Sequence, residues 1–219
     1  MLLYKYKDIS NENFKYTQDL FVNSRIYLPK ANLLNDPNEG VGIIDIKNQH
    51  HDYGNLLEER NRQCKTKVCS FTKNYKNVVM WSHYANQHKG ICIEFNFQNM
   101  SQEIKDKLVP VTYVDTVQHC EHKNVNHINF FSYKTKEWAY EEEVRYITNE
   151  NEEYLNISDD MIRRVYLGAR INTADIEWIK FWLKNYSKRK IELVQLKFKT
   201  MSYELIEIDK LESHEIRIV

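Results

Sequence analysis

The chain has 219 residues with 31 basic and 31 acidic side chains, so its formal net charge at pH 7 is zero. This balance excludes a global basic excess that would drive nucleic-acid binding by counterion release, although charges can still cluster locally. A hydrophobic fraction of 42%, a mean hydropathy of −0.67 and only 5 glycines and 3 prolines are typical of a globular protein without long disordered linkers.

The sequence contains no stretch that approaches the ~20 apolar residues of a membrane span. Its first residues lack the apolar run of a signal peptide, because a charge is reached at Lys5. Four cysteines without a Cys-x-x-Cys pair do not form a disulfide framework in a chain of this length. We therefore expect a cytoplasmic protein with no membrane partner. The cysteines are Cys64, Cys69, Cys92 and Cys120.

The first half of the chain mixes predicted strands with short predicted helices. A helix is expected over residues 10–21, capped by Ser10, and a second one over residues 78–85. Turn-forming residues predict a loop over residues 32–40, and residues 48–62 predict a polar, irregular excursion. Strands are expected at residues 2–6, 26–29, 67–72 and 90–97.

The second half of the chain continues the same mixture. Residues 119–129 are polar and rich in histidine, residues 130–137 predict a helix, and residues 173–186 predict a longer amphipathic helix. Because strands outnumber helices and no linker composition is found, we predict a single α+β domain over residues 1–219. The expected strands are at residues 109–115, 138–147, 161–167, 192–199 and 203–208.

The most informative motif is Trp-Ala-Tyr-Glu-Glu-Glu-Val-Arg-Tyr-Ile at residues 138–147. On a strand, alternation would place Glu141, Glu143 and Arg145 on one face. Three consecutive glutamates are poor strand formers, so their place among aromatic and β-branched residues indicates that the carboxylates are used. The alternative is a solvated face closed by a salt bridge.

A second motif is Met-Trp-Ser-His-Tyr-Ala-Asn-Gln-His-Lys-Gly at residues 80–90. On a helix, Trp81 and Tyr84 would share one face with His83 close by, because residues three and four apart are neighbours. Two aromatic rings and a histidine can stack and orient a planar ligand. The alternative is a helix that packs its aromatic face into the core.

The sequence patterns for a metal site or a cysteine nucleophile are weaker than these two motifs. His83 and His88 are five residues apart, outside the i, i+4 register, and residues 119–127 lack the paired ligands of a tetrahedral zinc site. We therefore expect no metal. Cys69 or Cys92 with His83 would make a nucleophilic pair, but both cysteines lie in apolar strands, where this residue is usually an inert small hydrophobe.

Taken together, five sequence blocks resemble a bacterial family, domain-of-unknown-function family 2971. The blocks follow the family's order, which makes the combination specific although each block is weak alone. The name of that family supplies no activity. The blocks are Leu-Tyr-Lys-Tyr at 3–6, Asn-Asp-Pro at 35–37 with Glu39, Cys-Ser-Phe at 69–71, Met-Trp-Ser-His-Tyr-Ala at 80–85 with His-Lys-Gly at 88–90, and Trp-x-Tyr-Glu-x-Glu-x-Arg at 138–145.

A more distant resemblance is to ADP-ribosyltransferases. The order of the predicted elements is similar to the layout of those enzymes: a first strand with a basic residue, a Ser-x-Thr strand, an aromatic helix and a late Glu-x-Glu strand. The resemblance implies a mixed or antiparallel split β-sandwich flanked by helices, with NAD in its cleft. It implies a basic position at Lys5, where the pattern has Arg or His, middle positions at Ser70 and Tyr84, and a catalytic position at Glu143.

The resemblance also implies a chemistry, in which NAD is the substrate that donates ADP-ribose. Glu143 would stabilise the oxocarbenium-like centre formed when the N-glycosidic bond breaks. Glu141 would position the acceptor or act as its base. Lys5 or Arg145 would meet the pyrophosphate.

The aromatic helix would then serve the nicotinamide end of NAD, with Trp81 and Tyr84 stacking the ring and His83 orienting it. The expected acceptor is a nucleic acid or a protein. Such an enzyme would act as a toxin or a phage-defence effector, with a neutralising antitoxin-type partner.

Two other functions remain open on the sequence. In a non-catalytic binding module, Glu141, Glu143 and Arg145 would satisfy one another as a structural polar network. In a metal-dependent nuclease or hydrolase, Asp36, Glu39 and the strand carboxylates would be oxygen ligands of a divalent cation.

Overall fold

A computed structural model of the chain describes residues 1–10, 12–36, 43–45, 65–116, 119–121, 131–148, 151–158, 160–187 and 190–208. The chain divides into two compact units, each built from several separate segments. The first unit contains Met1–Ile26, Thr72–Asn99 and Leu155–Val219, and the second contains Tyr27–Phe71 and Met100–Tyr154.

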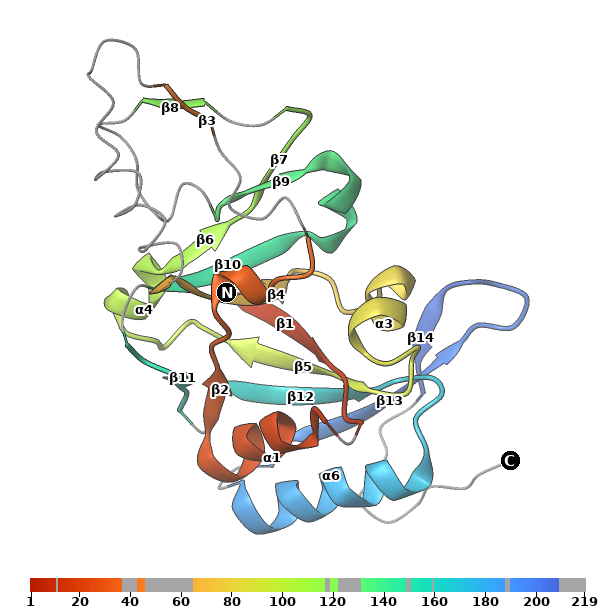
Figure 1. The fold of residues 1–219 in the computed structure, drawn as a ribbon. Helices are drawn as coiled ribbons and strands as arrows, with labels where there is room; N and C mark the ends of the chain where they lie inside the picture. Colours follow the sequence, from red (N-terminus) through yellow and green to blue (C-terminus); the bar gives the residue numbers. More distant parts are fainter. Residues whose placement is uncertain are drawn as a thin grey trace. The chain divides into compact units, whose positions relative to one another are not determined.

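The first unit is built on five neighbouring strands in the order β14-β13-β12-β5-β1 (Figure 1). All of their pairings are antiparallel except the parallel pair of β12 and β13. Strand β5 lies between β1 and β12, and five of its six residues are buried, four of them apolar and the fifth Glu94. The strands are β1 (Leu2–Lys7), β5 (Ile91–Asn96), β12 (Ile162–Leu167), β13 (Glu192–Phe198) and β14 (Leu205–Glu207).

The described residues of the first unit form three helices: α1 (Phe14–Asn23), α3 (Val78–Tyr84) and α6 (Thr173–Tyr186). Helices α1 and α6 lie side by side (Figure 1). The rings of Phe21 and Trp182 stack between them with their centroids 5.9 Å apart. Helix α3 packs on β1, where its Trp81 ring meets the Tyr6 ring edge-on at 5.2 Å. Asparagine side chains cap the N-termini of α3 and α6.

The second unit contains three neighbouring strands in the order β4-β10-β6 and two short parallel ribbons, β7 with β9 and β3 with β8. The helical segments among its described residues are short. The elements are η1 (Ala31–Leu33), β3 (Ile43–Asp45), β4 (Lys67–Thr72), α4 (Gln102–Asp106), β6 (Leu108–Pro110), β7 (Thr112–Val114), β8 (His119–Glu121), β9 (Tyr133–Thr135), η3 (Lys136–Glu141) and β10 (Glu143–Thr148); β2 (Arg25–Tyr27) and β11 (Tyr154–Asn156) lie where the units divide.

Strand β10 lies in the interior of the second unit, because all six of its residues are buried. Alternation points Glu143, Arg145 and Ile147 to one face. On that face Ile147 belongs to an apolar cluster with Ala31, Val68 and Phe131. A charged pair and an apolar cluster therefore occupy successive positions along one face of the same strand.

The α+β class predicted from the sequence is confirmed, since the described residues combine helices with sheets, and antiparallel pairs dominate among the strands of the first unit. Two element predictions match to the residue: the strand at Lys67–Thr72 and the helix at Thr173–Tyr186. The single domain over residues 1–219 and the split-sandwich arrangement of ADP-ribosyltransferases stay predictions.

Several local predictions were wrong. The predicted helix at 130–137 contains strand β9, whose Tyr133 and Thr135 are good strand formers and which pairs with β7. The predicted strand at 138–147 begins only at Glu143, because a 3₁₀ helix precedes it. Helix α1 begins at Phe14 and not at Ser10, whose hydroxyl donates to Asp8 instead.

Other predictions differ in their limits or lie outside the described residues. The predicted strand at 109–115 is two strands, β6 and β7, that pair with different partners. The polar excursion at 48–62 and most of the histidine-rich stretch lie outside the described residues. Among the residues that are described, no helix is long and apolar enough to cross a membrane.

Candidate functional site

The candidate site forms where the 3₁₀ helix η3 meets strand β10. Glu141 ends η3, Glu143 begins β10, and Glu142 between them adopts a left-handed conformation with φ of 46°. A non-glycine residue in this region costs some conformational energy, so the surrounding contacts must hold it there. This turn, and not simple strand alternation, brings the two carboxylates into one polar cluster.

Arg145 binds the carboxylate of Glu143 through two hydrogen bonds on the same face of β10. Its Nε donates to Oε1 and its Nη2 donates to Oε2, each at 2.9 Å. Its Nη1 donates to the backbone carbonyl of Phe131 at 2.8 Å. The guanidinium is fully buried, and bidentate geometry is the arrangement in which a buried arginine–carboxylate pair is strongest.

Three further groups reach Glu143 from neighbouring elements. The Ser70 hydroxyl, on β4, hydrogen-bonds its carboxylate, and Lys134 Nζ, on β9, lies 3.5 Å from its Oε2. The Glu143 backbone N–H donates to the Tyr113 hydroxyl on β7 at 2.8 Å. Burial raises the pKa of Tyr113 to about 12, so the phenol stays neutral at physiological pH.

The ionisation of Glu143 follows from these contacts. Burial by itself raises the pKa of its carboxyl group. The charge and hydrogen bonds of Arg145, the charge of Lys134 and the Ser70 hydrogen bond outweigh burial, and they hold the pKa below its ordinary value of 4.5. Glu143 is therefore a buried carboxylate that remains charged.

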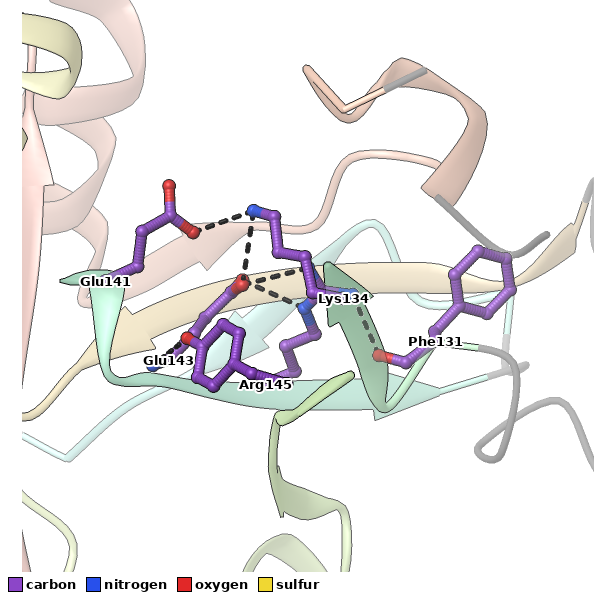
Figure 2. Close-up of polar contacts among 6 residues, drawn as sticks. Phe131, Lys134, Glu141, Glu143 and Arg145 are labelled. Carbon is purple, nitrogen blue, oxygen red and sulfur yellow. Dashed lines mark hydrogen bonds and ion pairs between the residues drawn. The ribbon is translucent and has the colours of Figure 1, made fainter. Parts of the chain in front are cut away.

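Lys134 links the two carboxylates (Figure 2). Its Nζ donates to Glu141 Oε2 at 2.7 Å and lies 4.4 Å from the centre of the Trp138 ring. Lys134 is 5% exposed, Glu141 2% and Glu143 5%. Two carboxylates and two cations, Lys134 and Arg145, thus form a compact, buried and charge-balanced group, which we call the Lys134–Arg145 cluster.

Four of the eight predicted site residues, Ser70, Glu141, Glu143 and Arg145, therefore lie together in the second unit. The other four lie in the first unit. Alternation along β1 points Lys5 to the sheet face opposite Tyr6, and Trp81 packs on Tyr6, so the first unit does not bring Lys5 and Trp81 together.

The predicted ligand-stacking helix, α3, places its three candidate residues in different environments. Trp81 is fully buried and its Nε1 donates to the Tyr75 carbonyl at 2.7 Å, which agrees with the core alternative for this residue. Tyr84 is half-buried and His83 is exposed, with their rings 6.2 Å apart.

The cysteine alternative has little physical support. Cys69 and Cys92 are free thiols that are fully buried in strands of the two units. Burial raises the pKa of the Cys92 thiol, and the charge of Glu94 adds to this effect, so the nucleophilic thiolate is disfavoured. Within the described ranges, no group of three or more His, Cys, Asp or Glu side chains is arranged to hold a metal ion.

The comparisons with known proteins give one family match. Residues 80–146 match the model of a family described as "Protein of unknown function (DUF2971)". This match covers the resemblance blocks from Met80 to Arg145, including most of the aromatic helix α3 and all four members of the Lys134–Arg145 cluster. No curated protein and no solved structure matches the chain.

Sequence reasoning missed Lys134 and Tyr113. Both lie at the centre of three-residue strands, β9 and β7, that pair in parallel register with Tyr113 opposite Lys134. A strand interpretation of Tyr-Lys-Thr at 133–135 would have singled out Lys134, because it is the one charged residue between two good strand formers. The parallel pairing of β7 and β9 has no signal in the local sequence of either strand.

Proposed function

We propose that the chain is a NAD-dependent ADP-ribosyltransferase that transfers ADP-ribose to a nucleic acid or a protein. The observation that carries this proposal is a buried carboxylate kept charged at physiological pH: Glu143, held by Arg145, Ser70 and Lys134, with a second carboxylate, Glu141, joined to it through Lys134. The resemblance of the sequence blocks to ADP-ribosyltransferases supplies the reaction class.

In this reaction the bond between ribose C1′ and the nicotinamide nitrogen breaks, and its electron pair leaves with nicotinamide. The positive charge that develops on the ribose is stabilised by Glu143. A fixed carboxylate in a site of low dielectric stabilises such a charge more strongly than one in water. The acceptor oxygen or nitrogen then bonds to C1′, and Glu141 takes its proton.

The experiment uses the purified protein with NAD labelled in its adenylate half and with separate pools of nucleic acid and protein as acceptors. We expect wild type to transfer label to one pool and Glu143→Gln to lose at least about a hundredfold in rate. The matched control is Glu142→Gln, the exposed neighbour, which should retain the wild-type rate. Transfer that is absent in wild type, or equal in Glu143→Gln, would contradict the proposal.

A second candidate is a binding module without catalysis, and a specific observation favours it. Glu143 and Arg145 are buried and bonded to each other through both carboxylate oxygens, the geometry of a structural ion pair. Under this proposal Glu143→Gln lowers the free energy of unfolding, and neither wild type nor variant releases nicotinamide above background. The transfer assay therefore separates the two candidates.

A further inference from the structure

Lys134 has no role in the proposal above beyond its charge, yet it has the most central position in the cluster. It is the middle residue of β9, and its amine is buried between the carboxylates of Glu141 and Glu143 (Figure 2). A lysine is rarely this buried, because removing an ammonium group from water is costly unless it is paired.

The two cations of the cluster have different partners. Arg145 engages both oxygens of Glu143, whereas Lys134 makes its short contact, at 2.7 Å, with Glu141 and reaches Glu143 only at 3.5 Å. Lys134 is therefore placed to balance the charge of Glu141. Without it, two buried carboxylates would face one guanidinium, and the excess negative charge would favour uptake of a proton.

Lys134 also fixes the direction of the Glu141 side chain. Its amine lies over the Trp138 ring at 4.4 Å, and Trp138 and Glu141 are three residues apart in η3. In a 3₁₀ helix this spacing stacks side chains one above the other. One amine therefore contacts both side chains of the turn and ties that turn to strand β9.

We propose that Lys134 is a positioning residue that keeps the Glu141 carboxylate ionised and aimed, so that Glu141 can take the proton of the acceptor. This inference rests on the proposed function. Lys134 touches neither NAD nor the acceptor; it acts through Glu141. The charged and titratable groups around Glu141 are Arg145 and Glu143 on β10, Lys134 on β9, Tyr113 on β7 and Tyr140 on η3.

The test compares the pH dependence of ADP-ribose transfer in Lys134→Met, Lys134→Arg and wild type. Methionine keeps an unbranched stem against Trp138 but removes the charge. We expect kcat to fall about tenfold or more, the acid limb of the profile to move up by about one pH unit or more, and KM for NAD to change little. Lys134→Arg should recover most of the rate.

Lys136→Met is the matched control, because Lys136 lies two residues away, is exposed and pairs with Asp115 at the surface. It should keep the wild-type profile. An unchanged profile in Lys134→Met would overturn the inference, and so would a loss of rate without a shift of the acid limb, since a purely structural role lowers activity at every pH alike. Lys134→Gln replaces the methionine variant if that one does not fold.

A second readout separates failure of this inference from failure of the proposed function. The Glu141 carboxyl carbon is followed by NMR during a pH titration, with Glu141→Gln identifying its signal. We expect the midpoint of the Glu141 titration to rise by about one pH unit or more in Lys134→Met. If wild type transfers no ADP-ribose but the midpoint rises, only the proposed function fails; an unchanged midpoint overturns the role of Lys134.

Discussion

The side chain of Glu143 is buried and charged, and its neighbours make that state stable. Arg145 supplies two hydrogen bonds to its carboxylate, and Ser70 and Lys134 approach it from two other strands. Removing one member of a buried pair leaves its partner without compensation, which is far more costly than losing a surface pair. The same residue therefore contributes to stability as well as to the proposed chemistry.

We expect Glu143→Gln to lower the free energy of unfolding by about 3 kcal/mol, because the Arg145 guanidinium is left buried without its counter-charge. Denaturant titration followed by circular dichroism measures this loss. Glu142→Gln, in the exposed neighbouring position, should stay within about 0.5 kcal/mol of wild type. Equal losses in the two variants would mean that the Glu143–Arg145 pair contributes nothing.

At the scale of elements, the segment after helix α3 is held in an uncommon backbone conformation. Asn86, Gln87 and His88 have consecutive positive φ values of 47°, 54° and 68°. The His88 carbonyl accepts a hydrogen bond from the Arg170 N–H, and the Gly90 carbonyl accepts one of 3.0 Å from the Gly168 N–H. This close approach anchors the end of α3 beside β12.

Gly168→Ala should prevent this approach, because its Cβ would lie 2.1 Å from the His88 carbonyl oxygen, which is backbone and cannot rotate away. We expect a loss of about 3 kcal/mol or more in the free energy of unfolding. Thermal and urea denaturation of the purified variant measure it. A variant as stable as wild type would show that β12 and the segment after α3 are not in contact as described.

At the scale of the molecule, the depressed pKa of Glu143 predicts how stability depends on pH. The carboxyl group binds a proton in the unfolded chain at higher pH than in the folded chain, so acid favours unfolding. The contribution is fully present above the ordinary value of 4.5 and is lost as pH falls through the lower folded value.

Urea titrations from pH 7 to pH 3 measure this dependence. The free energy of unfolding should fall more steeply with acid in wild type than in Glu143→Gln, which lacks the titrating group. An equal loss of the free energy of unfolding between pH 7 and pH 3 in both proteins would contradict this prediction.

The sequence predicted those parts of the molecule that local patterns control. Strand β4 and helix α6 were placed to the residue, and the shared face of Glu143 and Arg145 followed from strand alternation. In α6 an apolar stripe and an asparagine cap agree with each other, which is why its limits were clear.

The remaining parts depend on contacts between distant segments. The left-handed Glu142 and the 3₁₀ helix before it have no local signature, and the run of aromatic and charged residues there was mistaken for strand. Lys134 reaches the site because β9 pairs with β7, some twenty residues earlier. Pairing of this kind is set by tertiary packing, which overrides local propensity.

If the Glu143 carboxylate drives cleavage of NAD, the rate of nicotinamide release reports its effect without any need to know the acceptor. Wild type and Glu143→Gln, each verified as folded by circular dichroism, are incubated with NAD under identical conditions. We expect wild type to release nicotinamide and the variant to release it at a rate close to background. Equal background rates in both proteins would contradict this expectation.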